Sequence, residues 1–231
     1  MSTGTFPLLR WFQVGRSHPS ALLLAAQLLS LLLYPLMDDT HGGRMLFGAV
    51  ALVVVPLAVW VVSSSPAANW IAWLLAIPAI VSSVIAIVFD QPGLIALSSM
   101  FEAALYFYAA VSLISYMLHD HRVTTDELFA AGATFTLLAW GFAYAYYVCQ
   151  AWYPGSFTGM VDPDRPRQWI ELLFLSFSTL SGVGNGDVVP LGSPARVLVM
   201  FEQFAGVGYI AAVVSRLIGL TIVRSQRGDR D

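Results

Sequence analysis

Long apolar runs alternate with short polar segments along the whole chain. A helix that crosses the hydrocarbon core of a bilayer needs roughly 20 predominantly apolar residues. The long runs extend from Ser20 to Met37, Met45 to Val62, Ala68 to Phe89, Gly93 to Leu118, Leu128 to Trp152 and Ala195 to Val223. The pattern therefore predicts an all-α integral membrane protein with six transmembrane helices.

A further apolar run, Gln168 to Leu180, lies between the last two spans and is too short to cross a bilayer. We interpret it as a re-entrant helix, which enters and leaves the membrane on the same side. The segment after it, Ser181–Asp187, reads SGVGNGD and places a glycine at every second position. We call this segment the glycine loop.

The composition agrees with a membrane protein. Hydrophobic residues make up 58% of the chain and charged residues 11%, whereas a soluble domain carries about 25% charged residues. The segments between the apolar runs are short, so we expect no soluble domain. We divide the chain into an N-terminal region of four spans, 1–122, and a second region, 123–231, that holds the glycine loop.

Arginines are distributed unevenly between the two sides of the membrane that six spans define. Arg10, Arg16, Arg122, Arg224, Arg227 and Arg230 fall on one side, and Arg44, Arg165, Arg167 and Arg196 fall on the other. Because cytoplasmic segments carry an excess of basic residues, we expect both termini in the cytoplasm and the protein in the plasma (inner) membrane.

The glycine loop has the composition of an ion-binding backbone. Irregular backbone at membrane depth is tolerated only where it is buried in protein or lines a water-filled cavity. Glycine adopts positive φ at little cost, so positive φ at Gly184 and Gly186 would turn successive carbonyls to the same side. Such carbonyls can replace the hydration shell of a cation, and the negative end of the preceding helix favours a cation there too. Several copies around an axis would be needed to close the site.

A short helix, a glycine loop ending in Asp, and a final apolar helix together resemble the pore domain of tetrameric potassium channels, here a prokaryotic six-transmembrane member. The resemblance implies a homotetramer in a lipid bilayer, with potassium as the permeant ion and no other cofactor. It implies that the carbonyls of Gly182, Val183, Gly184 and Asn185 bind potassium in a selectivity filter. That filter comprises Ser181, Gly182, Val183, Gly184, Asn185, Gly186 and Asp187, and Gly206 or Gly208 would be the gating hinge.

Two residues of the loop depart from the pattern of that family. Gly182 stands where the family has Thr, which removes a side-chain ligand, and Asn185 stands where it has Tyr, which removes an aromatic brace. We therefore expect a potassium channel that discriminates against sodium less sharply, with a non-selective cation channel as the alternative. The span Gly93–Leu118 contains no Arg or Lys, so we do not expect voltage gating.

Five other residues are candidates for modulating the channel. Glu102 and Glu202 are carboxyl groups inside predicted spans, where such groups are often functional. Arg216 could reach the membrane interface, which we favour, or it could line an inner gate or pair with the acids Asp126 and Glu127. His119 and His121 could sense pH or hold a metal ion, although a solvated loop is the simpler interpretation.

Three other kinds of protein were weighed against the channel. Transporters also use broken helices, but usually as a pair in two repeated halves, and this sequence has one glycine loop. The loop does not fit phosphate-binding patterns, and the sequence shows no catalytic set, so we expect no enzymatic activity and no nucleic-acid partner. A non-conducting membrane subunit of the same fold remains open.

Overall fold

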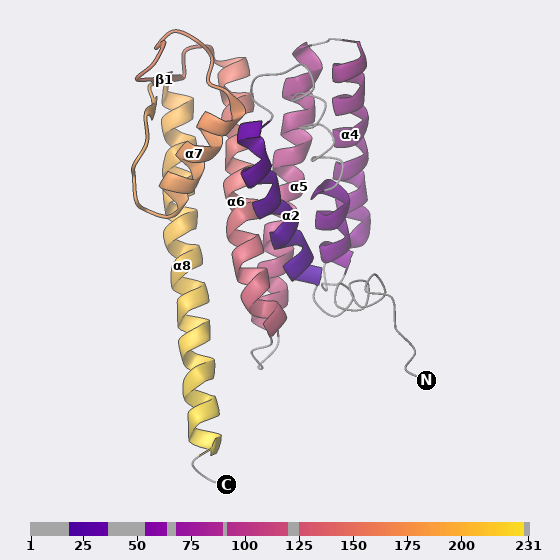
Figure 1. Ribbon diagram of the computed structural model, residues 1–231, viewed down its shortest axis with the longest axis vertical. Helices are drawn as coiled ribbons and strands as arrows, with labels where there is room; N and C mark the ends of the chain where they lie inside the picture. Colours follow the sequence, from indigo (N-terminus) through magenta and orange to yellow (C-terminus); the bar gives the residue numbers. More distant parts are fainter. Residues whose placement is uncertain (1–18, 37–53, 64–67, 90–91, 120–124, 229–231) are drawn as a thin grey trace.

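The computed structural model describes residues 19–36, 54–63, 68–89, 92–119 and 125–228. Helices make up nearly all of this part of the chain (Figure 1). They are α2 (Pro19–Leu33), the 3-10 helix η1 (Tyr34–Leu36), the helix Val54–Ser63, α4 (Asn69–Val88), α5 (Pro92–His119), α6 (Thr125–Trp152), α7 (Trp169–Leu180) and α8 (Ser193–Gly228). Two short strands, β1 (Phe157–Gly159) and β2 (Val188–Pro190), pair antiparallel.

Four of the predicted spans are confirmed as helices long and apolar enough to cross a membrane. They cover Asn69–Ala86, Gly93–Leu118, Asp126–Trp152 and Ser193–Arg216. The first two predicted spans correspond to the shorter helices Pro19–Leu33 and Val54–Ser63, and residues 37–53 of that region lie outside the described part. The protein is therefore a multi-pass, mainly helical membrane protein.

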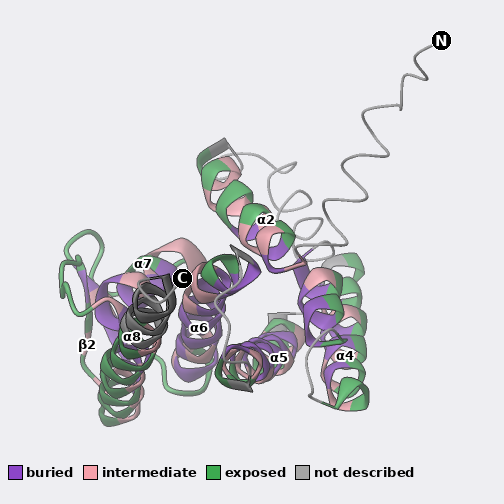
Figure 2. Cartoon of the chain, turned by 90° about the horizontal axis from the view of Figure 1, so that it is seen from below, coloured by how far each residue is buried: buried purple, intermediate pink, exposed green. Residues whose placement is uncertain are grey.

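Helix α6 is at the centre of the molecule. It contacts α2, α5, α7 and α8, and 67% of the residues in its membrane-spanning segment are buried inside the molecule (Figure 2). Small residues on its surface allow close helix packing: a Cβ on Gly132 would lie 2.9 Å from a methyl carbon of Leu24, and one on Gly141 would lie 3.0 Å from the ring of Phe107. α6 thus joins the N-terminal helices to the elements that carry the glycine loop.

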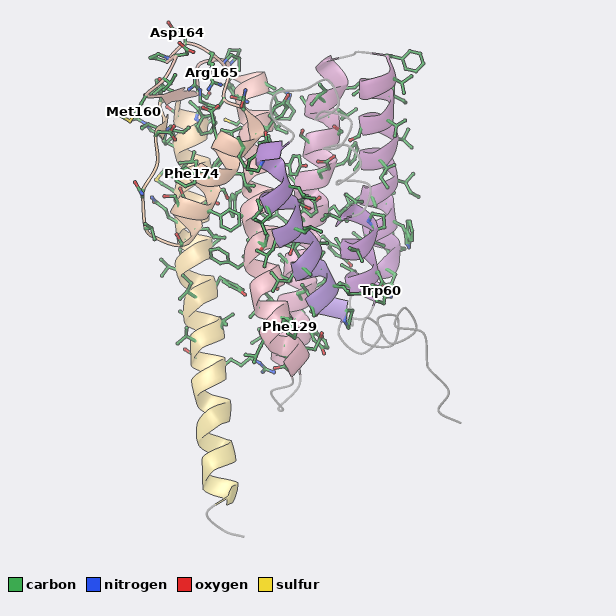
Figure 3. The ribbon with its side chains drawn as sticks, in the orientation of Figure 1. Trp60, Phe129, Met160, Asp164, Arg165 and Phe174 are labelled. Atoms are coloured by element: carbon green, nitrogen blue, oxygen red, sulfur yellow. The ribbon has the colours of Figure 1, made fainter. Side chains whose placement is uncertain are left out.

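The antiparallel strands β1 and β2, which we call the strand pair, hold together the segments before and after α7. β1 follows α6, β2 follows the glycine loop, and Phe157 is paired with Pro190. In Figure 3, Asp164 and Arg165 lie at the end of the molecule that holds the strand pair, and Phe129 lies at the opposite end of α6. The strand pair therefore ties the segment before α7 to the segment that follows the glycine loop.

Candidate functional site: the glycine loop and its supports

The glycine loop leaves the C-terminal end of α7 with two glycines in left-handed conformations. φ is 74° at Gly182 and 67° at Gly184. The prediction of positive φ is therefore confirmed for Gly184 and wrong for Gly186. Gly182 takes the left-handed position directly after Ser181, the C-cap of α7, where glycine commonly ends a helix, and its N–H donates to the Thr179 carbonyl at 3.1 Å. Gly186 instead precedes the backbone pairing that begins at Asp187, whose carbonyl accepts from Met160 N–H at 3.2 Å.

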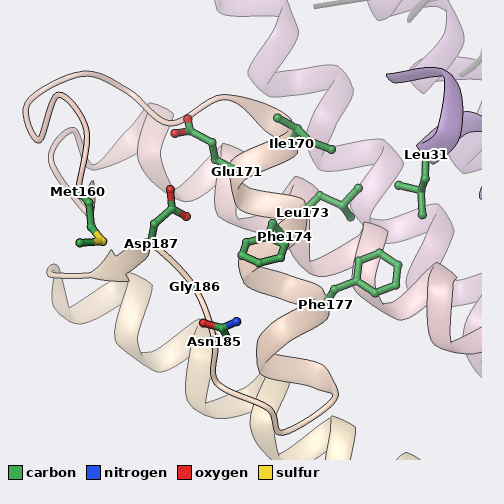
Figure 4. A pocket seen from close by; sticks show the side chains of 10 residues that line it. All are labelled: Leu31, Met160, Ile170, Glu171, Leu173, Phe174, Phe177, Asn185, Gly186 and Asp187. Carbon is green, nitrogen blue, oxygen red and sulfur yellow. The ribbon is translucent and has the colours of Figure 1, made fainter. Parts of the chain in front are cut away.

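The loop lies beside an open hollow of about 710 Å³. Residues 182–187 are all exposed. Figure 4 shows Asn185 on the stretch of loop opposite Phe174 of α7, and Asp187 nearer the strand pair, beside Met160. The backbone and side chains of the loop are thus accessible to ions or to another copy of the chain.

Ion pairs and hydrogen bonds of charged residues hold the start of α7, at the end of the molecule near the strand pair. Arg165 donates to both carboxylate oxygens of Glu171, at 2.8 and 2.9 Å, and Glu171 accepts from the N–H of Gln168 at 2.6 Å in a capping box. Arg167 is buried and donates to the backbone carbonyls of Val161, Asp162 and Arg165. These contacts hold the first turn of α7 to the segment that precedes it.

Two contacts join α7 to α8 at its other end. Glu202 of α8 is fully buried and is hydrogen-bonded to Tyr146 of α6 and to Ser176 of α7. One helical turn further along α8, Gly206 is packed so tightly that a Cβ there would overlap the carbonyl oxygen of Leu180. Glu202 and Gly206 thus face the last turns of α7, directly behind the origin of the glycine loop.

This part of the chain matches a known protein family, and one known protein is similar to part of the chain. A family model described as "Ion channel" matches residues 132–222, from α6 through most of α8. Protein LctB of Bacillus caldotenax is 31% identical over 101 residues, which span 42% of this chain and 75% of LctB. The chain belongs to the ion channel family. No solved structure matches it significantly.

Gly208, the second hinge candidate of this ion channel, differs from Gly206 in its surroundings. A Cβ on Gly208 would meet no atom within 4 Å. α8 is continuous through both positions. Gly206 therefore has a packing role in the observed structure, and a hinge at either glycine stays a prediction.

Glu102 lies in the N-terminal helices of the channel, away from the glycine loop. It is buried, and its carboxylate accepts a hydrogen bond from Ser83 of α4 at 3.1 Å and also interacts with the Tyr144 hydroxyl of α6. Tyr144 in turn packs on Trp169, the first residue of α7, with ring centroids 5.6 Å apart. Glu102 is thus linked to the start of α7 through one tyrosine.

Arg216 is paired within the channel with Glu127, one of its two predicted acidic partners, and a position at the membrane interface stays a prediction. Its guanidinium bonds both carboxylate oxygens of Glu127 at 3.2 and 3.3 Å, and both side chains are largely buried. Asp126, the other candidate partner, accepts from Ser20 at 3.0 Å. The Arg216–Glu127 ion pair joins α8 to α6 at the end of the molecule opposite the β1–β2 strand pair.

The remaining predictions concern two histidines. His119 is the last residue of α5, and its side chain lies outside the described part, as does all of His121. Sequence reasoning also missed three residues that hold the site, Tyr146, Ser176 and Arg167. A signal existed for Arg167 alone, since an arginine next to the apolar run 168–180 could have been expected to cap its loop.

Proposed function

We propose that the protein is a homotetrameric cation channel of the plasma (inner) membrane, with both termini in the cytoplasm, and that potassium passes along the carbonyls of the glycine loop. The observation that carries this proposal is the conformation of the loop. Gly182 and Gly184 have positive φ at alternate positions, as a column of carbonyls facing one side requires. The residues between them and after them are exposed and not packed against their own subunit.

The exposed face of α8 supports assembly around an axis. Only 11% of the residues in the membrane-spanning segment of α8 are buried within one chain, whereas 67% are buried in that of α6. Large apolar side chains on α8 are exposed, among them Phe201 at 63%, Phe204 at 81% and Val207 at 68%. Four α8 helices around a central path would place the four glycine loops together and leave the N-terminal helices outside.

The oligomeric state is a direct test of this arrangement. We expect a tetramer when the protein is purified in mild detergent and its mass is measured by light scattering with the detergent contribution subtracted. Crosslinking in native membranes should give a ladder that ends at four chains. A stable monomer in both measurements would contradict the channel proposal, because one chain supplies one side of the ion path.

Ion selectivity should be lower than in the potassium channel family. Gly182 offers a carbonyl but no side-chain oxygen, and Asn185 faces an open hollow where the family has a packed tyrosine. Flux from proteoliposomes with potassium and then sodium gradients measures this. A ratio of potassium to sodium flux above one but below that of a channel with the family's Thr and Tyr supports the proposal. A ratio equal to that of such a channel contradicts it, and equal fluxes identify a non-selective cation channel.

Asn185→Tyr is the cleaner of two variants that restore the family pattern. We expect it to raise the ratio of potassium to sodium flux several-fold, because the ring would fill part of the hollow beside Phe174 and stiffen the loop. Asn185→Gln, which adds length without a ring, is the matched control. Gly182→Thr is a poor test, since a β-branched residue at φ 74° is strained. An unchanged ratio in Asn185→Tyr would show that the aromatic brace is not what limits selectivity.

A further inference from the structure

Glu202 is an acidic residue in a membrane-spanning helix. Its side chain is fully buried, and among the residues that the structure describes no ion pair involves it. An isolated ionised carboxylate in such a place is very costly. The titratable groups that α6 presents to it are Tyr146 and, beyond Tyr146, Cys149. From α7 it meets the hydroxyl of Ser176.

The Ser176 hydroxyl has one hydrogen and two oxygen neighbours. Ser176 Oγ lies within hydrogen-bonding distance of two oxygen atoms, the carbonyl of Ala139 at 2.7 Å and Glu202 Oε1. A serine hydroxyl has one hydrogen, and a carbonyl oxygen only accepts. If Ser176 donates to Ala139, its contact with Glu202 is a hydrogen bond only when the carboxyl group carries a proton and donates it.

A protonated Glu202 satisfies every polar atom of the cluster. The Tyr146 hydroxyl donates to Oε2, Oε1–H donates to Ser176 Oγ, and Ser176 donates to the Ala139 carbonyl. The chain of hydrogen bonds starts on α6, passes through α8 and α7, and returns to α6. Buried polar networks are stable when every member is satisfied, so the three helices are tied together at one level.

We propose that Glu202 is a neutral carboxylic acid that acts as a positioning residue, holding α7 in place for ion conduction. This rests on the proposed function, since it concerns the path formed by the glycine loop. Ser176 lies one turn before Leu180, and Glu202 lies one turn before Gly206, so two contacts in the same register join α7 and α8. The first sets the protonated bridge, and the second sets the height at which the glycine loop begins.

Three variants at position 202 separate a neutral donor from a charge. Glu202→Gln keeps a group that donates to Ser176 and accepts from Tyr146, and we expect potassium flux within about twofold of the wild type. Glu202→Leu has similar bulk but leaves both hydroxyls without a partner, and we expect flux to fall about tenfold with a lower ratio of potassium to sodium flux. Glu202→Asp keeps the acid but shortens its reach, and should resemble Leu.

Infrared spectroscopy of the protein in liposomes tests the protonation state without any ion flux. The wild type should show the C=O stretch of a protonated carboxylic acid at neutral pH that is absent from Glu202→Gln. Glu102→Gln is the control, since it removes a buried carboxyl group elsewhere. A spectrum in which Glu202→Gln removes only carboxylate bands would overturn the proposal, as would a Gln variant as defective as Leu.

The same experiments separate this inference from the proposed function. A wild type that passes no cation but shows the acid band, with thermal stability kept in Gln and lost in Leu, contradicts the channel proposal and supports the neutral bridge. A conducting wild type without the band supports the channel and overturns the bridge.

Discussion

Gly206→Ala is expected to abolish most ion flux and to destabilise the protein, whereas Gly208→Ala should be close to the wild type. The two glycines lie two residues apart in α8, but a Cβ on Gly206 would overlap the Leu180 carbonyl oxygen and one on Gly208 would meet nothing within 4 Å. The Leu180 carbonyl belongs to the last turn of α7, so it cannot move aside without shifting the glycine loop. Overpacking of this kind costs about 1–3 kcal/mol.

The comparison of these two variants also tests the hinge prediction. Alanine is favoured over glycine in a helix by about 1 kcal/mol, so Gly208→Ala should be as stable as the wild type or slightly more stable. Unfolding in mixed micelles and flux from proteoliposomes should be measured together. Stability retained with flux lost in Gly208→Ala would support a hinge there. A Gly206→Ala protein with normal stability and flux would refute the packing role of Gly206.

Glu127→Gln should lower the free energy of unfolding by about 3 kcal/mol, because it removes the carboxylate that the largely buried Arg216 guanidinium binds. This contact is one of the few polar links between α6 and α8. The reciprocal variant Arg216→Gln should cost a similar amount. Asp126→Asn, one residue earlier and hydrogen-bonded to Ser20 instead, is the matched control and should cost less.

A double-mutant cycle shows whether the loss comes from this pair. Glu127→Gln with Arg216→Gln should be more stable than the sum of the single changes predicts, since neither charge is then left alone. Additive losses would mean that each side chain acts through other neighbours. Because both groups are shielded from solvent, added salt should change the wild-type stability little.

The helices that follow strong apolar runs were predicted closely. The run Gly93–Leu118 became α5, Pro92–His119, and the short run Gln168–Leu180 became α7, Trp169–Leu180. Each of these runs is apolar apart from a few polar residues and contains a single charged residue, Glu102 in the first and Glu171 in the second, so local sequence determines it. The position of Gly182 at the end of α7 was missed because helix termination was not considered beside the alternation of glycines.

Contacts between helices could not be predicted from the sequence. Arg216 and Glu127 are 89 residues apart, and the partners of Glu202 lie on two other helices. Which faces of two apolar helices meet depends on the shapes of many small side chains, and α6 has such side chains on several sides. The sequence therefore indicated Glu127 only as one of several possibilities for Arg216, and indicated no partner for Glu202.

The two attachments of α8 have a mechanical consequence. Gly206 fixes the helix against Leu180, and Arg216 fixes it to Glu127 of α6, so the segment between them behaves like a beam clamped at both ends, about 15 Å long at 1.5 Å per residue. Such a beam cannot swing as a rigid rod about one pivot. Widening the path at its inner end requires either release of the ion pair or an outward movement of α6 together with α8, which would carry the N-terminal helices with it.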